Sequence, residues 1–178
     1  KEKKSLTSIS KGNALNYSMV FWDQIFKEVS EEYPDVKTYS YLVDAASMFM
    51  VKDPKRFEIV VTSNLFGDIL TDECAMLTGS MGLLPSASIA EGSFGLYEPA
   101  GGSAPDIAGK GIANPLAQVL STALMLRYTF KEEEAACAIE KACEKVISQG
   151  IRTGEIWTEG CTKVGTTGMG DAIIAALD

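Results

Sequence analysis

The chain has 178 residues, 46% of them hydrophobic, which is ample material for a packed core and argues against disorder. Its 16 Lys and Arg residues and 24 Asp and Glu residues give a net charge of −8. A field of that sign repels phosphate backbones and anionic lipids, so we expect neither a nucleic-acid partner nor a membrane partner. No uninterrupted apolar run reaches the roughly 20 residues that a membrane-spanning helix needs.

The chain has no histidine and four cysteines, none of them in a CxxC pair. This composition argues against structural zinc and excludes catalysis by Ser-His-Asp or Cys-His within this chain. Lysine, carboxylates, tyrosine and a bound metal remain as possible acids, bases and electrophiles. Cys74, Cys137 and Cys143 lie among small apolar residues, as reduced cysteines do, and we therefore expect a cytoplasmic protein.

In its first half the chain alternates between helical and strand patterns. The periodicity of the apolar residues predicts a helix over 19–32, and the apolar run 57–61 is typical of a strand buried in a parallel sheet. Between them we expect a strand over 37–43 that ends at Asp44, then a helix over 45–51. A further helix is expected over 68–78.

The second half begins with a stretch rich in Gly and Pro, residues 79–115, which we expect to be a long loop-rich region. Asn114 is predicted to cap the next helix, with Pro115 at the first helical position. Further helices are expected over 131–149 and about 169–177. Strands and helices alternate early and helices dominate late, a pattern that predicts an α/β protein cut out of something larger.

Two carboxylates, Asp68 and Asp72, stand four residues apart in NLFGDILTDE, just after the apolar strand. At this spacing both lie on one face of a helix, near the strand's carboxyl end, where α/β proteins place ligands. A hard cation such as Mg²⁺ or Mn²⁺ would neutralise them through oxygen ligands. The alternative is a solvated acidic helix face.

A second candidate is the Gly- and Pro-rich loop from Glu98 to Asn114, whose glycines would let the backbone approach a ligand closely. Asp106 would accept hydrogen bonds from ribose hydroxyls and repel a 2′-phosphate, which favours NAD over NADP. An ordinary surface loop is the alternative. A third candidate is Lys11, a possible base between a possible strand and a helix, although a lone lysine is usually solvated surface.

Several segments together resemble the β-decarboxylating dehydrogenases of the isocitrate/isopropylmalate family over almost the whole chain. The motifs NLFGDILTDE and GSAPDIAGKGIANP carry the resemblance, and MLTGS, GLLPSAS, LRYTF and GIRTGEI indicate the isopropylmalate branch. The resemblance implies that family's sheet-and-helix architecture with only the C-terminal half present. Residues 1–78 would be the later part of the small, dimer-forming domain, and residues 79–178 the C-terminal part of the large domain.

The resemblance also implies a role for each site residue. Asp68 and Asp72 match metal-binding aspartates, and Asp44 matches a third that also contacts substrate and comes from the partner subunit. Lys11 matches a catalytic lysine that is likewise lent across a homodimer with shared active sites, with Asp44 assisting it. The remaining matches are cofactor-binding: Asn13, Gly102, Ser103, Ala104, Pro105, Asp106, Ile107 and Asn114.

The implied reaction is the oxidative decarboxylation of a small 2-hydroxy acid, 3-isopropylmalate, with NAD and Mg²⁺ or Mn²⁺, as a step of leucine biosynthesis. The segment KGNALNYSMVFWDQ looks more like the tartrate or D-malate enzymes of the family, and Gly101 stands where many relatives carry His. Tartrate, D-malate or homoisocitrate therefore remain alternative substrates, and a non-catalytic subunit is a further alternative. Because the family's N-terminal half, with its substrate-binding arginines, is missing, we expect this chain alone to be inactive.

Overall fold

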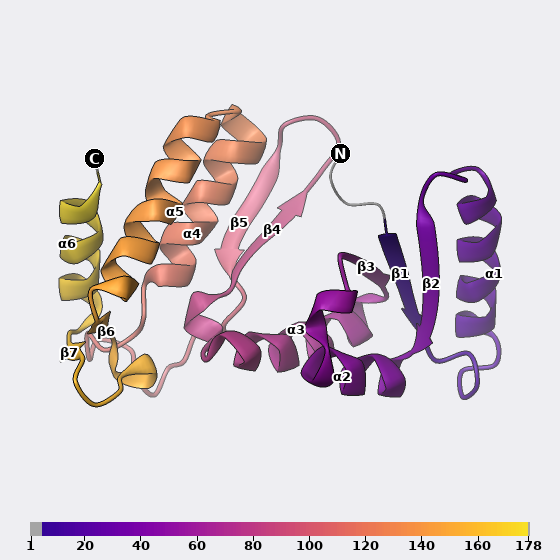
Figure 1. Cartoon of the computed structure of the whole chain (residues 1–178), viewed down its shortest axis with the longest axis horizontal. Coiled ribbons are helices and arrows are strands. Elements are labelled where there is room, and N and C mark those ends of the chain that lie inside the picture. The colour runs from indigo at the N-terminus through magenta and orange to yellow at the C-terminus, as the bar shows by residue number, and fades with distance from the viewer. Residues whose placement is uncertain (1–4, 178) are drawn as a thin grey trace. The chain divides into compact units, whose positions relative to one another are not determined.

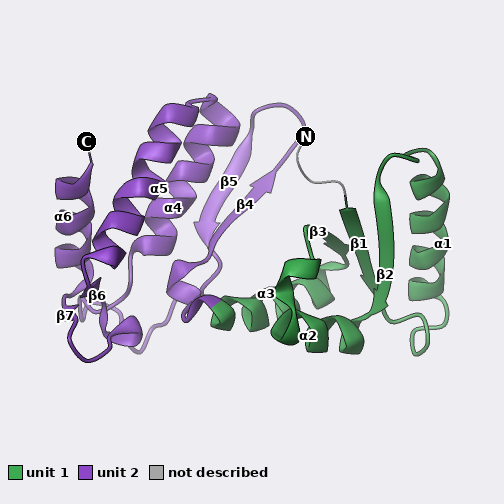
Figure 2. Ribbon diagram, in the orientation of Figure 1, with its two compact units in different colours: residues 1–77 green, residues 78–178 purple. Residues whose placement is uncertain are grey.

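The computed structural model describes residues 5–177, and the chain divides into two compact units, residues 1–77 and 78–178 (Figure 2). Both units combine helices with strands, which confirms the α/β class (Figure 1). No helix among residues 5–177 is long and apolar enough to cross a bilayer.

The first unit is built on a three-stranded parallel sheet in the order β2-β1-β3. Its strands are β1 (Ser5–Ser10), β2 (Lys37–Leu42) and β3 (Ile59–Thr62). Parallel neighbours need crossover connections, and the chain supplies them as α1 (Ser18–Glu31) and α2 (Val43–Lys52), the latter followed by a 3₁₀ turn at Pro54–Arg56. Helix α3 (Asn64–Thr78) follows β3.

The core of this unit lies where α2 and α3 pack against the central strand. Its buried members are Ile9, Ala46, Met50 and Leu70. Helix α1 is fastened to the same strand by the Trp22 indole, which donates a hydrogen bond to the Ser8 hydroxyl at 2.9 Å. The central strand is thus in contact with α2 and α3 in the core and with α1 through the Ser8 hydroxyl. Its polar residues Thr7, Ser8 and Ser10 are almost fully buried.

The second unit opens with an antiparallel hairpin of β4 (Pro85–Ile89) and β5 (Gly95–Pro99), preceded by a 3₁₀ turn at Met81–Leu83. Helix α4 (Leu116–Met125) continues into a π-helical turn, Leu126–Phe130. Helix α5 (Glu133–Ser148) and helix α6 (Thr166–Ala176) enclose the short parallel pair β6 (Ile151–Arg152) and β7 (Thr162–Lys163), with a 3₁₀ turn at Gly154–Ile156.

Three helices of the second unit share one core. Leu116 of α4, Val146 of α5 and Met169 of α6 are each at most 1% exposed within it. The Asn114 side chain accepts a hydrogen bond from the Leu116 N–H at 3.0 Å, as expected from the sequence, but α4 begins at Leu116, so its N-cap residue is Pro115 rather than Asn114. Helix α5 begins with Glu133 and Glu134 in its first turn, and Gly150 follows its end with φ +80°.

Several expected boundaries were wrong. Helix α3 begins at Asn64 rather than 68, so Asp68 lies in the second turn, and α2 begins at Val43, so Asp44 belongs to a helix rather than to the end of a strand. Helix α6 begins at Thr166, three residues early. The stretch 79–115 contains the β4–β5 hairpin, which sequence reasoning missed because its strands are short and rich in Pro, Gly and Ser.

Candidate active site

The chemistry-bearing residues of the first unit follow the carboxyl ends of its three strands. Lys11 comes directly after β1, Asp44 stands two residues after β2, and the helix that carries Asp68 and Asp72 starts two residues after β3. Because the strands are parallel, these ends lie on one edge of the sheet. That edge is where open α/β sheets bind their ligands.

Lys11 and Asp44 form an ion pair at this edge. The Lys11 Nζ donates a hydrogen bond to Asp44 Oδ1 at 2.7 Å, with the lysine side chain 25% exposed and the carboxylate 66% exposed. This hydrogen bond is the main reason that the pKa of Asp44 is lowered, with a smaller contribution from backbone hydrogen bonding at the start of α2. Asp44 therefore holds the lysine nitrogen at a defined place while leaving it partly open to solvent.

The backbone around Lys11 turns sharply, which leaves the side chain at the strand's end. The N–H groups of Ala14 and Leu15 both donate to the Lys11 carbonyl, at 3.0 and 2.9 Å. Asn13 lies exposed within this turn, two residues from the lysine. Its expected role in binding the cofactor stays a prediction.

Asp68 and Asp72 lie one turn apart on α3 and are both exposed. Neither carboxylate makes a hydrogen bond or ion pair with another residue in the described part of the chain, so both keep their oxygens available to a hard cation. Among residues 5–177 no three His, Cys, Asp or Glu side chains gather closely enough to hold a metal, so Asp44 does not join Asp68 and Asp72 within one chain.

The loop that the sequence singled out in the second unit runs as a chain of tight turns. Successive N–H groups reach back three residues, from Ile107 to the Ala104 carbonyl and from Lys110 to the Ile107 carbonyl, both at 3.1 Å. Ala104, Gly109 and Gly111 take positive φ values of 41°, 75° and 63°. A side chain placed at Gly101, Gly102, Gly109 or Gly111 would meet nothing within 4 Å among the described residues, so this backbone is open to close approach.

The polar groups of this loop lie at its surface and at its far end. The Asp106 carboxylate is exposed among Gly102, Ser103, Ala104 and Pro105, which are exposed too, while Ile107 is half-buried. At the end of the loop the oxygen of the Asn114 side-chain amide accepts a hydrogen bond from the Leu116 N–H, and its Nδ2 is buried with no hydrogen-bond partner among residues 5–177. A buried amide donor without a partner is costly, and a nearby acceptor on a ligand would relieve that cost.

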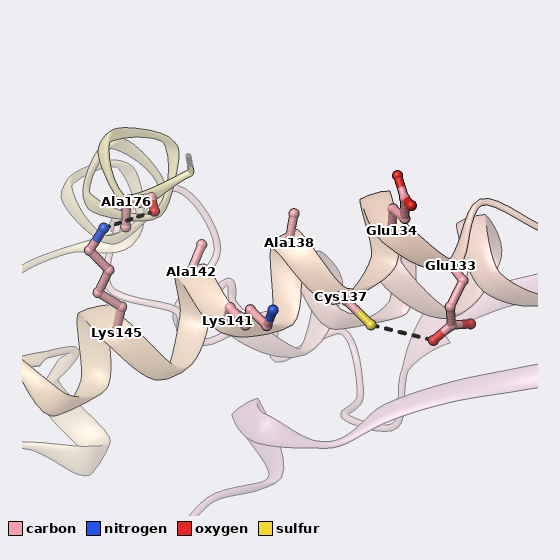
Figure 3. A pocket seen from close by; sticks show the side chains of 8 residues that line it. All are labelled: Glu133, Glu134, Cys137, Ala138, Lys141, Ala142, Lys145 and Ala176. Carbon is pink, nitrogen blue, oxygen red and sulfur yellow. Dashed lines mark hydrogen bonds between the residues drawn. The ribbon is translucent and has the colours of Figure 1, made fainter.

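A separate pocket of about 410 Å³ lies along α5 beside the end of α6 (Figure 3). Its walls carry Glu133, Cys137 and Lys141, and the Cys137 thiol donates to the Glu133 carboxylate at 3.4 Å. None of the residues predicted to bind metal or cofactor lines it. We therefore keep two candidate sites, the sheet edge of the first unit and the loop of the second.

What the sequence did not reveal is the support behind Lys11. The buried hydroxyl of Ser8 accepts a hydrogen bond from the Trp22 indole. The Thr62 hydroxyl donates a hydrogen bond to the Ile9 carbonyl at 3.0 Å and so links β3 to β1. The sequence signal was weak, because the Ser- and Thr-rich segment SLTSIS is typical of a solvated strand, and its burial follows only from its central place in the sheet.

The first unit thus offers an ion pair and two unpaired aspartates at a sheet edge, and the second offers an exposed glycine-rich loop, both within an α/β protein. The model of the family described as isocitrate/isopropylmalate dehydrogenase matches residues 1–173, and the chain therefore belongs to the isocitrate/isopropylmalate dehydrogenase family.

Curated relatives and solved structures agree with this membership. The chain is 57% identical over 174 residues to a 3-isopropylmalate dehydrogenase of Xanthomonas oryzae pv. oryzae, covering 98% of this chain and 48% of that protein. It is 58% identical over 177 residues to a 3-isopropylmalate dehydrogenase of Ralstonia nicotianae, covering 99% and 49%. The crystal structure of isocitrate dehydrogenase from Methylococcus capsulatus superposes with a TM-score of 0.92 at 40% identity, covering 98% and 50%. The chain thus spans about half the length of the curated relatives it matches.

Proposed function

We propose that this chain is part of an enzyme that oxidises and decarboxylates 3-isopropylmalate to 4-methyl-2-oxopentanoate while reducing NAD, a step of leucine biosynthesis. The observation that carries the proposal is the Lys11–Asp44 ion pair, which stands at the same sheet edge as two unpaired aspartates. Relatives at 57–58% identity that carry the name 3-isopropylmalate dehydrogenase support the choice of substrate. The first unit would then be the later part of the small domain, and the second the C-terminal part of the large domain.

Asp68 and Asp72 would hold Mg²⁺ or Mn²⁺, for which their free carboxylate oxygens are suited. The loop 102–114 would hold the adenosine part of NAD, with Asp106 facing the ribose hydroxyls. When bound, the metal would polarise the substrate's hydroxyl and carboxylate, and NAD would take up the hydride.

Lys11 is the group of this chain that would move a proton. Its Nζ is partly exposed and fixed by Asp44 at 2.7 Å, so it presents one nitrogen at a constant position to a substrate hydroxyl, directly or through a water molecule. Asp44 has two tasks in this scheme. It orients the lysine, and its second oxygen is left to approach the substrate or the metal.

We further propose that the active sites are shared across a homodimer. Lys11 and Asp44 pair with each other within one chain, whereas Asp44 does not come together with Asp68 and Asp72 there. A site that needs all four groups is therefore completed by a second subunit, which lends the Lys11–Asp44 pair to the partner's aspartates.

All four cysteines are free thiols, as suits a protein that works in the reducing cytoplasm.

Turnover by the intact protein tests the proposal. With NAD and Mn²⁺ we expect 3-isopropylmalate to give the highest kcat/KM, above tartrate, D-malate and homoisocitrate, with one CO₂ released for each NADH formed. A higher value for tartrate or D-malate would replace the substrate and keep the reaction. Absence of turnover with all four acids, while NAD and metal still bind, would overturn the enzyme reading in favour of a non-catalytic subunit.

A further inference from the structure

The start of helix α6 is bonded to the end of the loop 102–114, across more than 50 residues of sequence. The Thr166 N–H donates a hydrogen bond to the Gly111 carbonyl at 2.9 Å. The Thr166 hydroxyl donates a second hydrogen bond to the Ala113 carbonyl at 2.6 Å. One threonine thus holds the loop backbone at two points, two residues apart.

Gly165, just before this threonine, packs directly against the same loop carbonyl. A Cβ atom at Gly165 would lie 2.5 Å from the Gly111 oxygen, closer than side-chain carbons approach other atoms. The obstacle is backbone, which cannot rotate away as the tip of a side chain can. Any residue other than glycine at this position must therefore move either α6 or the loop.

The loop is the partner that would move. Helix α6 is anchored by Met169, Ile173 and Ala176, which are buried in the core of the second unit. The loop, by contrast, has glycines at positive φ on either side of Lys110, and those glycines stand in open space among the described residues. A clash at Gly165 would therefore displace residues 111–113, directly before Asn114 and the start of α4.

We propose that Gly165 and Thr166 are positioning residues for NAD: they fix the backbone of residues 111–114 in the arrangement that receives the adenosine part of the cofactor. The inference rests on the proposed function, in which this loop holds NAD. Neither residue need touch the cofactor, because both act through the Gly111 and Ala113 carbonyls.

The test compares alanine substitutions at two glycines of one segment in the intact protein. Gly165→Ala introduces the clash, whereas Gly170→Ala, within α6, places its methyl group where nothing lies within 4 Å. We expect Gly165→Ala to weaken NAD binding by roughly tenfold in calorimetric titration, the equivalent of about 1.4 kcal/mol. We also expect faster amide hydrogen exchange in residues 107–114 without any cofactor. Gly170→Ala should match the wild type in both measurements.

A second pair of variants tests the hydroxyl. Thr166→Val removes the bond to Ala113 and should weaken NAD binding by about threefold to tenfold, as expected for one hydrogen bond. Thr166→Ser keeps a hydroxyl and should restore most of the affinity. The KM for NAD should rise in Thr166→Val while the KM for the 2-hydroxy acid stays constant, a split that general destabilisation would not produce.

The outcomes separate the inference from the function on which it rests. If amide exchange in residues 107–114 is the same in Gly165→Ala and Gly170→Ala, Gly165 does not position the loop, and the inference fails while the proposed function stands. If exchange becomes faster but NAD affinity is unchanged, the loop does not bind NAD, and the assignment of the cofactor site fails with the inference.

Discussion

The two units present their candidate functional groups in opposite ways. In the first unit the groups are charged side chains, Lys11, Asp44, Asp68 and Asp72, that stand on or next to regular elements at the ends of parallel strands. In the second unit the candidate site is mostly backbone, a run of turns from Gly102 to Asn114 shaped by glycines at positive φ.

The two regions also differ in how they are supported. The strand before Lys11 is held by neighbours on adjoining elements, such as Trp22 and Thr62. The loop is held at its far end by Thr166, which lies 53 residues beyond Ala113. A single substitution in the first unit should therefore remove a chemical group outright, whereas one in the second should shift a backbone and weaken binding by degrees.

The largest expected effect is that of Lys11→Met, which should lower kcat of the intact protein by about 10²–10⁴-fold, the usual contribution of a general base. NAD affinity should hardly change, because the proposed task of the lysine is to move a proton, while the loop 102–114 is proposed to hold the adenosine part of NAD. Steady-state kinetics and NAD titration measure the two quantities. Lys27→Met, at an exposed position of α1, is the matched control and should retain activity. A Lys11→Met variant with near-normal kcat would show that the ion pair is only structural.

The proposed sharing of active sites across a homodimer gives Lys11→Met a second use. Mixing Lys11→Met subunits with Asp68→Asn subunits should restore activity in heterodimers, because one of the two sites regains both groups. If each site is complete within one chain, no heterodimer site is whole. Activity that stays at the level of the mutant homodimers, with subunit exchange verified by mass spectrometry, would contradict sharing.

Asp72→Asn should have the next largest effect, on metal binding. Loss of an outer-shell partner of a metal typically costs about 10–100-fold in affinity, and loss of a direct ligand should cost at least as much. Calorimetric titration of the intact protein with Mn²⁺ in the presence of 3-isopropylmalate measures this. Asp35→Asn removes the same charge from an exposed turn and should leave the affinity unchanged. Equal affinities for the two variants would place the metal elsewhere.

The same contrast explains which features the sequence could predict. Asp68 and Asp72 were recognisable because a helical spacing of four and a preceding apolar strand fix both their common face and their place at a sheet edge. The hydrogen bond between Asn114 and the Leu116 N–H was recognisable for a similar reason, since it spans only two residues, although α4 begins one residue later than expected. Interactions of this kind are local, so the order of residues determines them.

Long-range interactions were not accessible in this way. The buried strand β1 consists largely of Ser and Thr, whose burial depends on two neighbouring strands and on α1. The hairpin β4–β5 was read as loop because its strands become favourable only when they pair with each other. The contacts of Gly165 and Thr166 with the loop join segments that are distant in the sequence, and no spacing in the sequence indicates them.

Asp106 tests the graded response expected of the second unit. Asp106→Asn should raise kcat/KM for NADP relative to NAD by about tenfold, because a charge in a partly wet site repels a 2′-phosphate by at most a few kcal/mol. Glu91→Gln removes one negative charge from the turn between β4 and β5 and is the control, with no change in the ratio expected. The two cofactors are compared under saturating substrate. An unchanged ratio in Asp106→Asn would remove this residue from cofactor selection.

The smallest expected effect concerns stability rather than activity and lies away from both sites. Arg127, in the π-helical turn after α4, donates to both oxygens of Glu140 at 2.6 and 2.8 Å, and these bonds lower the pKa of Glu140. A lowered folded pKa means that the pair's contribution is present above the ordinary Glu pKa of about 4.3 and is lost as the pH falls through the folded pKa. Glu140→Gln should therefore reduce the free energy of unfolding by about 1 kcal/mol at pH 7, a modest value because the carboxylate is a third exposed.

Denaturant unfolding at pH 7 and pH 3 measures this effect, and the difference in free energy of unfolding between Glu140→Gln and the wild type should be smaller at pH 3. Glu144→Gln, on the same helix without an ion pair to the described residues, should change stability little at either pH. A difference that persists undiminished at low pH would assign the effect of Glu140 to packing instead of charge.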